Sequence, residues 1–253
     1  MMLPSNAVIH GDCLEVMPSI PDKSIDMILC DLPYGTTACK WDTIIPFEPL
    51  WEQYERIIKD NGAIVLTASQ PFTSALVMSN PKMFRCEWIW DKKIPSGMSY
   101  ARYHPMRRHE NVLVFSINTV NYNPQMTNRD IPIVQGGNKY SPSAPIQGRK
   151  NGISHKKVYD KKQPTTIMPF DKIRSGSLHP TQKPVALFEY LIKTYTNEGE
   201  TVLDNCIGSG TTAIAALNTG RFFIGIEKEE KYVEIARKRI AEHQHQQSIE
   251  VLS

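Results

Sequence analysis

Short apolar runs rich in Val and Ile alternate along the chain with stretches of helical period. The runs at 6–10, 26–30 and 63–68 are short and compact, as buried parallel strands are, and the first two end just before a polar or turn residue. Between the second and third runs, apolar residues recur on one face over 49–59, which predicts a helix that Asn61-Gly62 would stop.

The alternation continues to the end of the chain. Further helices are expected over 14–20, 72–78, 184–195, 211–218 and 231–243, and further strands over 86–90, 111–116, 201–204 and 222–227. Strands and helices that alternate at these lengths predict an α/β fold with a doubly wound, mostly parallel sheet. The Pro-, Gly- and Ser-rich stretch 117–178 lacks a periodic pattern and is expected to be an insertion that does not join the sheet.

Composition narrows the class of protein. A chain of 253 residues with 41% hydrophobic content can bury one sizeable core. No run of about 18 apolar residues is present and the first residues do not resemble a secretory signal, so a cytoplasmic, intracellular protein without a membrane partner is expected. The five cysteines are scattered, which predicts neither disulfides nor a metal site.

A glycine-containing motif near the end of the chain suits a nucleoside cofactor. The strand ending at Asp204 is followed by a turn with Gly208 and Gly210 and by a helix opening at Thr211, so backbone N–H groups can approach a ligand. Glu227 ends the next strand, where a carboxylate can accept hydrogen bonds from ribose hydroxyls. The glycine spacing also fits a dinucleotide, which leaves NAD open. Because an acid before the glycines disfavours pyrophosphate but can hold an ammonium group, S-adenosylmethionine is favoured.

The sequence Asp31-Leu32-Pro33-Tyr34-Gly35 follows an early strand and suits chemistry on an aromatic amine. Such an amine is a weak nucleophile, because its lone pair is delocalised into the ring. Two acceptors that take hydrogen bonds from its N–H groups favour a more tetrahedral nitrogen. We expect these acceptors to be the Asp31 carboxylate and the Leu32 carbonyl, with Pro33 holding Leu32 extended and Tyr34 stacking on the base.

In this order, the motifs resemble those of the β-class amino-methylating DNA methyltransferases. That family carries a D-P-P-Y tetrad early, then a target-recognition insertion, an H-P-T-Q-K-P segment and a D-P-F-x-G-S-G-T-T motif. The counterparts here are 31–34, 117–178, His179 to Pro184, and 204–212. Leu32 departs from the first proline of the tetrad, and Asn205-Cys206 departs from Pro-Phe.

The resemblance implies a seven-stranded, Rossmann-like sheet in circularly permuted order. Residues 1–116 would form the catalytic half, 117–178 the target-recognition insertion and 179–253 the cofactor half of one core. The strand ending at Asp204 should then lie beside the strand that leads to Asp31. S-adenosylmethionine would be the cofactor and S-adenosylhomocysteine the product, and family analogy suggests a homodimer.

The resemblance also assigns cofactor contacts residue by residue. Asp12 would meet the adenine, Glu227 the ribose, and Asp204 with 181–183 the methionine end. The full implied set is Asp12, Asp31, Thr181, Gln182, Lys183, Asp204, Cys206, Gly208, Ser209, Gly210, Thr211, Thr212 and Glu227.

The charge distribution points to double-stranded DNA as the partner. Segment 117–178 carries ten Lys or Arg against three Asp, a charge of +7 that leaves −4 to the rest of a chain whose net charge is +3. Phosphate contacts from this segment would offset the cost of flipping a base out of a duplex. The candidate contacts are Arg149, Lys150, Lys156, Lys157 and Arg174.

The leading hypothesis is therefore a site-specific DNA adenine-N6 methyltransferase, of the kind found in restriction-modification systems. Cytosine-N4 methylation remains an alternative, because the two amines present similar geometry. A nicotinamide-dependent oxidoreductase is a more remote alternative.

Overall fold

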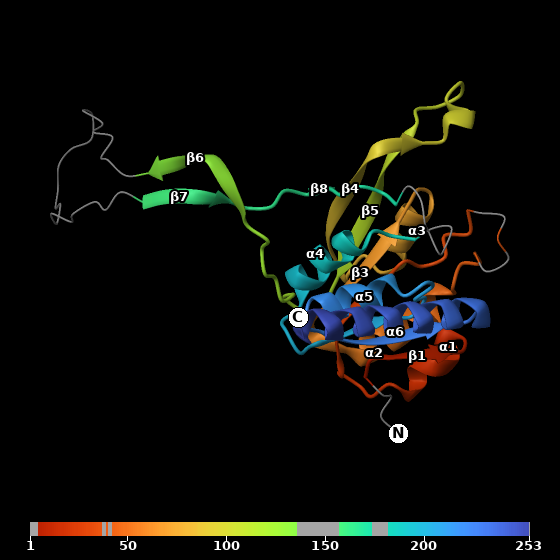
Figure 1. Cartoon of the computed structure of the whole chain (residues 1–253). Helices are drawn as coiled ribbons and strands as arrows, with labels where there is room; N and C mark the ends of the chain where they lie inside the picture. The colour runs from red at the N-terminus through yellow and green to blue at the C-terminus, as the bar shows by residue number, and fades with distance from the viewer. Residues whose placement is uncertain (1–4, 37–38, 40–41, 136–156, 174–181, 253) are drawn as a thin grey trace, which may run out of the picture. The chain divides into compact units, whose positions relative to one another are not determined.

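The computed structural model describes residues 5–36, 39, 42–135, 157–173 and 182–252 (Figure 1). The chain forms two compact units. The larger unit consists of residues up to Asn123 together with Thr166 onwards, and the smaller unit is Pro124–Thr165. The smaller unit lies within the predicted insertion 117–178 and is narrower than that range.

An eight-stranded sheet runs through the larger unit in the order β1-β10-β9-β2-β3-β5-β4-β8. Neighbours from β1 to β3 are parallel, β5 is antiparallel to both β3 and β4, and β8 is parallel to β4. The strands are β1 Ala7–His10, β2 Ile25–Cys30, β3 Ile58–Ala68, β4 Phe84–Ser96, β5 Arg107–Phe115, β8 Ile167–Pro169, β9 Thr201–Asp204 and β10 Phe222–Glu227. The predicted α/β, mostly parallel, Rossmann-like sheet is confirmed, with eight strands where seven were expected.

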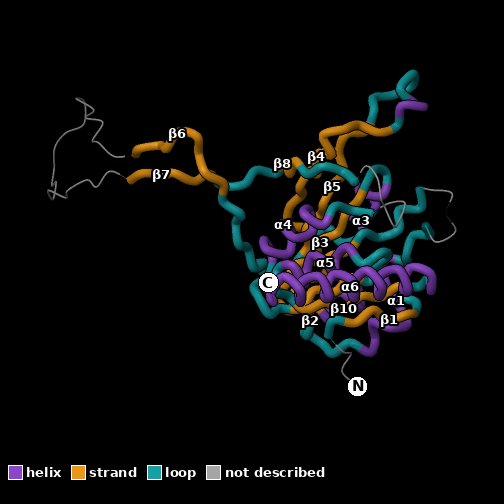
Figure 2. The backbone as a smooth tube through the Cα atoms, viewed as in Figure 1, coloured by secondary structure: helices purple, strands orange, loops and turns teal. Residues whose placement is uncertain are grey.

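Helices cover both faces of this sheet, because its central strands are apolar on both sides. All six residues of β2 are buried, and they alternate between two hydrophobic clusters: Met27 and Leu29 belong to one, Ile28 and Cys30 to the other. Helices α4, α5 and α6 contribute to the first cluster, and α1, α2 and α3 to the second. Figure 2 shows α5 and α6 lying across one face of the strands.

The helices are α1 Cys13–Val16, α2 Phe47–Ile57, α3 Phe72–Ser79, α4 Val185–Tyr195, α5 Thr211–Asn218 and α6 Glu230–Leu252, with short 3-10 turns η1 Met17–Ser19 and η2 Met98–Tyr100. No helix in the described part of the chain has both the length and the apolar character that crossing a membrane requires.

Two sequence-based expectations about the sheet are wrong. The segment 117–178 does reach the sheet, because its residues Ile167–Pro169 form β8 on the edge strand β4. Met168 is buried there, and the indole of Trp90 donates a hydrogen bond to the Phe170 carbonyl at 2.8 Å. A strand of three residues is too short to show a period in the sequence.

Helix α2 ends at Ile57, not at Asn61-Gly62, because β3 begins with the next residue. Ile58 pairs with Ile25 of β2, after which the register shifts so that Ala63 faces Met27. The intervening glycine is needed for close approach: a Cβ on Gly62 would lie 2.8 Å from the Asp26 carbonyl oxygen. Gly62, which suggested the end of a helix, therefore lies instead where the pairing of β2 with β3 shifts register.

The smaller unit contains an antiparallel pair of strands, β6 Thr127–Gln135 and β7 Lys157–Lys162. The sequence pattern predicts neither of these two strands. Every residue of β7 is exposed, and Ile131 of β6 is 81% exposed, so the pair has no buried face to impose an alternating pattern.

The strand leading to Asp31 and the strand ending at Asp204 are neighbours, as predicted. β2 pairs with β9 in parallel, with Ile28 opposite Leu203. After β2 the chain continues to β3 on one side of this pair, and after β9 it continues to β10 on the other side. Such a switch point leaves a crevice at the carboxyl ends of the strands, where open α/β sheets bind ligands.

Candidate active site

A pocket of about 650 Å³ opens at this switch point and is lined by both sequence motifs. The volume is within the usual range for small-molecule sites. The predicted residues that line it are Asp12, Asp31, Leu32, Pro33, Tyr34, Gln182, Lys183, Asp204, Cys206, Gly208, Ser209, Thr211, Thr212 and Glu227. The two halves of the permuted chain thus share one cavity.

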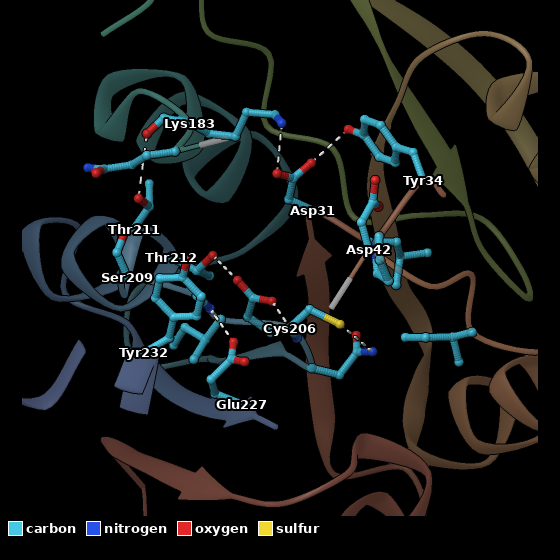
Figure 3. Close-up of a pocket in the computed structure, with 18 of the residues that line it drawn as sticks. Asp31, Tyr34, Asp42, Lys183, Cys206, Ser209, Thr211, Thr212, Glu227 and Tyr232 are labelled. Atoms are coloured by element: carbon cyan, nitrogen blue, oxygen red, sulfur yellow. Dashed lines mark hydrogen bonds and ion pairs between the residues drawn. The ribbon is translucent and has the colours of Figure 1, made fainter. Parts of the chain in front are cut away.

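Asp31 is the centre of the catalytic motif and is held by three side chains, two of which, Lys183 and Tyr34, are seen in Figure 3. The Tyr34 hydroxyl donates to Asp31 Oδ1 at 2.7 Å, and the buried Thr67 hydroxyl at the end of β3 donates to the same oxygen. Lys183 Nζ lies 2.7 Å from Oδ2. These contacts fix the plane of the carboxylate. Because each oxygen carries two lone pairs and Oδ1 already accepts from two hydroxyls, one further hydrogen bond can still be accepted, at Oδ2.

Lys183 also belongs to a chain of alternating charges behind Asp31. Its Nζ lies 3.4 Å from Glu110 Oε2, and Lys92 Nζ lies 3.1 Å from Glu110 Oε1. Burial by itself lowers the pKa of Lys183, but the carboxylates of Asp31 and Glu110 outweigh it and raise this pKa above its ordinary value. Lys183 is therefore a charged donor, and sequence analysis had placed it only at the methionine end of the cofactor.

Tyr34 was expected to stack on the target base. In the structure its ring stacks on Phe72, with ring centres 5.2 Å apart and planes inclined by 26°, while its hydroxyl faces Asp31. Burial, reinforced by the nearby carboxylates, raises the pKa of Tyr34 well above its ordinary value, so the hydroxyl is a neutral donor. The role in base stacking stays a prediction.

Asp42 is a site residue that sequence analysis missed. Its carboxylate accepts hydrogen bonds from two consecutive backbone N–H groups, those of Gly35 and Thr36, each at 2.9 Å. This arrangement holds the chain directly after Tyr34, and Asp42 itself lines the pocket. An isolated acid in a loop without a periodic pattern gives no signal in the sequence.

On the cofactor side, Asp204 is buried at the end of β9. The Cys206 amide donates to its Oδ1 at 3.0 Å, and the Thr212 hydroxyl donates to its Oδ2. Burial raises the pKa of Asp204 to about 7, although these hydrogen bonds oppose the shift. A positively charged ligand group beside it would favour the ionised form.

Glu227, at the end of β10, is held by backbone groups. The Gly208 and Glu229 amides donate to its two oxygens at 2.8 and 2.9 Å, and burial raises its pKa. The loop before it needs glycines, because Gly208 and Gly210 have φ of 52° and 84°, in the left-handed region. Gly210 does not line the pocket; it shapes the turn into α5.

Asp12 caps α1 by accepting from the Leu14 amide at 2.9 Å, and it pairs with Lys228 at 3.0 Å. Its slight burial would raise the pKa of Asp12, but the Lys228 and Leu14 contacts hold it below its ordinary value. Asp12 is thus an ionised group at the pocket edge, where sequence analysis placed the adenine.

The departure at Asn205-Cys206 has a structural basis. The buried hydroxyl of Tyr54, on α2, donates to Asn205 Oδ1 at 2.6 Å, so the amide satisfies a group that a proline could not. Cys206 lines the pocket beside it. A hydrogen bond with the Cys13 thiol lowers the pKa of Cys206, but the Cys30 thiol, burial and the Asp204 carboxylate outweigh it and raise this pKa well above its ordinary value, so the Cys206 thiol stays neutral.

The structure does not bring every predicted residue to the pocket. Thr181, Arg149, Lys150, Lys156 and Arg174 lie outside the described residues, and Lys157 is exposed on β7 of the smaller unit. Among the residues that the structure describes, no group of three or more His, Cys, Asp or Glu could hold a metal ion.

The two carboxylates on the cofactor side of the pocket fit a nucleoside that carries a positive charge. Asp204 and Glu227 are two buried carboxylates in one pocket, and within the described ranges neither has a Lys or Arg side chain within 4 Å. Their partners are hydroxyl and amide donors, which leaves acceptor capacity for the ammonium group and ribose hydroxyls of a bound cofactor. A pyrophosphate at this place would be repelled by two carboxylates that no Lys or Arg side chain in the described ranges pairs with.

Comparison with known proteins identifies the family. Residues 25–238 match the family described as DNA methylase, whose members modify exocyclic N6 or N4 amines. The chain belongs to this family. It is 31% identical over 257 residues to the DNA adenine methyltransferase YhdJ of Escherichia coli, covering 93% of this chain and 83% of that protein. It is 53% identical over 272 residues to the type II methyltransferase M2.DpnII of Streptococcus pneumoniae, covering 92% and 88%.

The fold is that of solved amino-methyltransferases. The M1.HpyAVI–SAM complex superposes with a TM-score of 0.62 at 23% identity over 92% of this chain and 98% of that chain. The PvuII cytosine-N4-specific DNA methyltransferase superposes with a TM-score of 0.65 at 15% identity over 96% and 92%. Membership of the DNA methylase family confirms the predicted DNA methyltransferase and its cofactor S-adenosylmethionine, and it leaves the oxidoreductase alternative without support.

Proposed function

We propose that this DNA methylase is a site-specific DNA adenine-N6 methyltransferase that modifies a base flipped out of double-stranded DNA. The observation that carries the proposal is the position of Asp31: a carboxylate held from three sides, at the switch point of the sheet, in the same pocket as Asp204 and Glu227. We infer an intracellular role as the modification partner in a restriction-modification system, as the names of the type II relatives suggest.

The chemistry assigned to the residues follows from their contacts. Bound S-adenosylmethionine supplies an electrophilic methyl group. Asp31 and the Leu32 carbonyl accept hydrogen bonds from the two N–H groups of the target amine, which directs its lone pair along the transfer line. Lys183, Tyr34 and Thr67 hold Asp31 in place without contacting the amine. No side chain forms a covalent intermediate.

The proposed cofactor contacts use the second set of residues. Asp204 would hold the ammonium group and Glu227 the ribose hydroxyls, while Asp12 would lie near the adenine. Gln182, which lines the pocket beside Lys183, would contact the carboxylate of the methionine end.

Adenine is favoured over cytosine by two observations. The tetrad begins with Asp, which leans towards adenine in the resembling family, and a 31% identical relative is named a DNA adenine methyltransferase. The fold itself does not discriminate between the two bases, because a cytosine-N4-specific enzyme superposes on this chain with a TM-score of 0.65.

A labelled-methyl assay followed by nucleoside digestion tests the proposal. Duplex DNA of varied sequence is incubated with the enzyme and labelled S-adenosylmethionine, and the digest is expected to contain N6-methyladenine. Asp31→Ala is expected to abolish transfer. A digest with label in N4-methylcytosine would replace the adenine proposal with the cytosine alternative, and near-normal turnover by Asp31→Ala would reject the site.

A further inference from the structure

A hairpin arm extends from the pocket side of the sheet. Strands β4 and β5 continue beyond the body of the larger unit and are joined through η2, and Figure 1 shows this hairpin projecting away from the helices. We call residues 93–108 the arm. Its tip makes short local turns, with the Tyr103 amide donating to the Tyr100 carbonyl at 2.9 Å.

The root of the arm is part of the active-site pocket. Ser96 and Arg107 face each other across the two strands, and both line the pocket. One step further in, Lys92 of β4 and Glu110 of β5 form the ion pair that continues to Lys183 and Asp31. A ligand that enters the pocket with its target group at Asp31 therefore passes the foot of the arm.

The arm is basic and has no acid of its own. Residues 93–108 contain four Lys or Arg and no Asp or Glu. Two of the four are already paired: Arg108 with Asp91 at 2.6 Å and Lys93 with Asp171 at 3.3 Å. Arg102 and Arg107 are exposed and have no carboxylate partner within the described residues.

Aromatic side chains are interleaved with these charges. Tyr103 is 83% exposed and Tyr100 is 60% exposed, so neither belongs to the core. Tyr100 stacks on His104, with ring centres 5.8 Å apart and planes inclined by 21°, whereas Tyr103 has no ring partner in the described part of the chain. Exposed aromatic rings between unpaired arginines are the combination that binds nucleic-acid strands, by stacking on bases and neutralising phosphates.

We infer that the arm is a DNA-binding element, in which Arg102 and Arg107 contact phosphates and Tyr103 stacks on a base beside the target nucleotide. The inference rests on the proposed function, since it takes the substrate of the pocket as the partner of the arm. It assigns substrate contact to the catalytic half of the chain, where the insertion had been the expected source.

Equilibrium binding tests the inference without requiring methyl transfer. The full chain is titrated against a labelled 30-base-pair duplex of mixed sequence and against one of its strands, over a series of salt concentrations. Tyr103→Ala is expected to weaken binding to the single strand roughly ten-fold, and Tyr103→Phe to restore it. Arg102→Gln and Arg107→Gln are each expected to weaken binding to both probes and to reduce the salt slope by about one.

Matched controls lie near the beginning of strands, at the opposite end from the pocket and the arm. Phe222 is 44% exposed at the start of β10, and Lys82 is exposed just before β4, at the end of that strand remote from the arm. Phe222→Ala and Lys82→Gln should bind DNA as the parent does. Equal loss by arm and control variants, or parental affinity and salt slope in all arm variants, overturns the inference. Arm effects in a protein that transfers no methyl group would instead reject the proposed function alone.

Discussion

The position of Asp31 depends on the charge of Lys183, which comes from the cofactor half of the chain. Lys183 is buried between Asp31 and Glu110, so replacing it with an apolar residue removes a charge-assisted hydrogen bond and leaves two carboxylates facing each other. We predict that Lys183→Met lowers kcat about a hundred-fold, as expected from losing an interaction of roughly 3 kcal/mol with a charged group. Lys183→Arg, which keeps the charge, should recover much of the loss. Steady-state kinetics at saturating DNA measure both.

The same variants separate two roles for Lys183. If Lys183 positions Asp31, Lys183→Met retains its affinity for S-adenosylmethionine while kcat falls. If it binds the methionine end of the cofactor, as the resemblance implies, that affinity falls in parallel. Calorimetric titration of the cofactor decides between them, and an unchanged kcat would contradict the positioning role.

Asp204 predicts a pH dependence of stability. Burial raises its pKa to about 7 from an ordinary 3.8, so the folded protein holds a proton that the unfolded chain has released. The resulting stability is fully present below about pH 4 and is lost as pH rises through about 7. We predict that, as pH rises from about 4 to about 7, the Tm of the cofactor-free parent falls relative to that of Asp204→Asn. Thermal unfolding at a series of pH values measures it, and parallel curves would show that Asp204 ionises normally.

At the scale of elements, the loop between β2 and α2 depends on Asp42. Its carboxylate satisfies the amides of Gly35 and Thr36, and the loop lines the pocket directly after the tetrad. Asp42→Ala leaves both amides without an acceptor, at a cost of about 1–3 kcal/mol for each that stays buried. We predict a loss of about ten-fold in kcat/KM, with Asp42→Asn intermediate because it keeps one acceptor oxygen.

The control for this loop is a carboxylate that touches nothing in the pocket. Asp60 is 70% exposed and forms a surface ion pair with Lys23. Asp60→Asn should leave kcat/KM within two-fold of the parent, since exposed ion pairs contribute about 1 kcal/mol or less. A similar loss in both variants would indicate a general effect of charge.

The elements that the sequence predicted well are those whose pattern follows from burial. Strands β9 and β10 and helix α5 were expected at the bounds that the structure has, because a fully buried strand and a glycine turn leave direct marks in the residues. The pairing of β2 with β9 was also predicted, because a transferred methyl group requires the two motifs to meet.

Other features of the structure leave no mark in the sequence, for physical reasons. β6 and β7 pair without a buried face, so their residues show no alternation. The Lys92–Glu110–Lys183 chain joins residues from β4, β5 and the start of α4, and no spacing in the sequence signals such a contact. Asp42 likewise acts through backbone amides, which any residue type provides.

At the scale of the whole molecule, the two halves of the permuted chain are joined by buried polar contacts as well as by the sheet. Lys183 reaches Asp31, and the Tyr54 hydroxyl donates to Asn205. Neither half can complete the pocket alone, because Asp31 and Asp204 enter it from adjacent strands that are distant in sequence.

The homodimer suggested by family analogy stays a prediction. Sedimentation equilibrium should give a mass twice that of the 28.7 kDa chain, and the mass of a monomer would reject the homodimer.

The two hydrophobic clusters contain no described residue of segment 124–165. None of the buried residues within the described ranges lies between Ser116 and Met168, so the hydrophobic clusters form without segment 124–165. We predict that replacing 125–164 with a Gly/Ser linker of about ten residues retains the Tm and the affinity for S-adenosylmethionine, while methyl transfer to duplex DNA falls at least ten-fold. Cofactor titration and the labelled-methyl assay measure the two effects on one preparation. Loss of cofactor binding would show that the smaller unit is needed for the fold, and full transfer activity would remove it from target recognition.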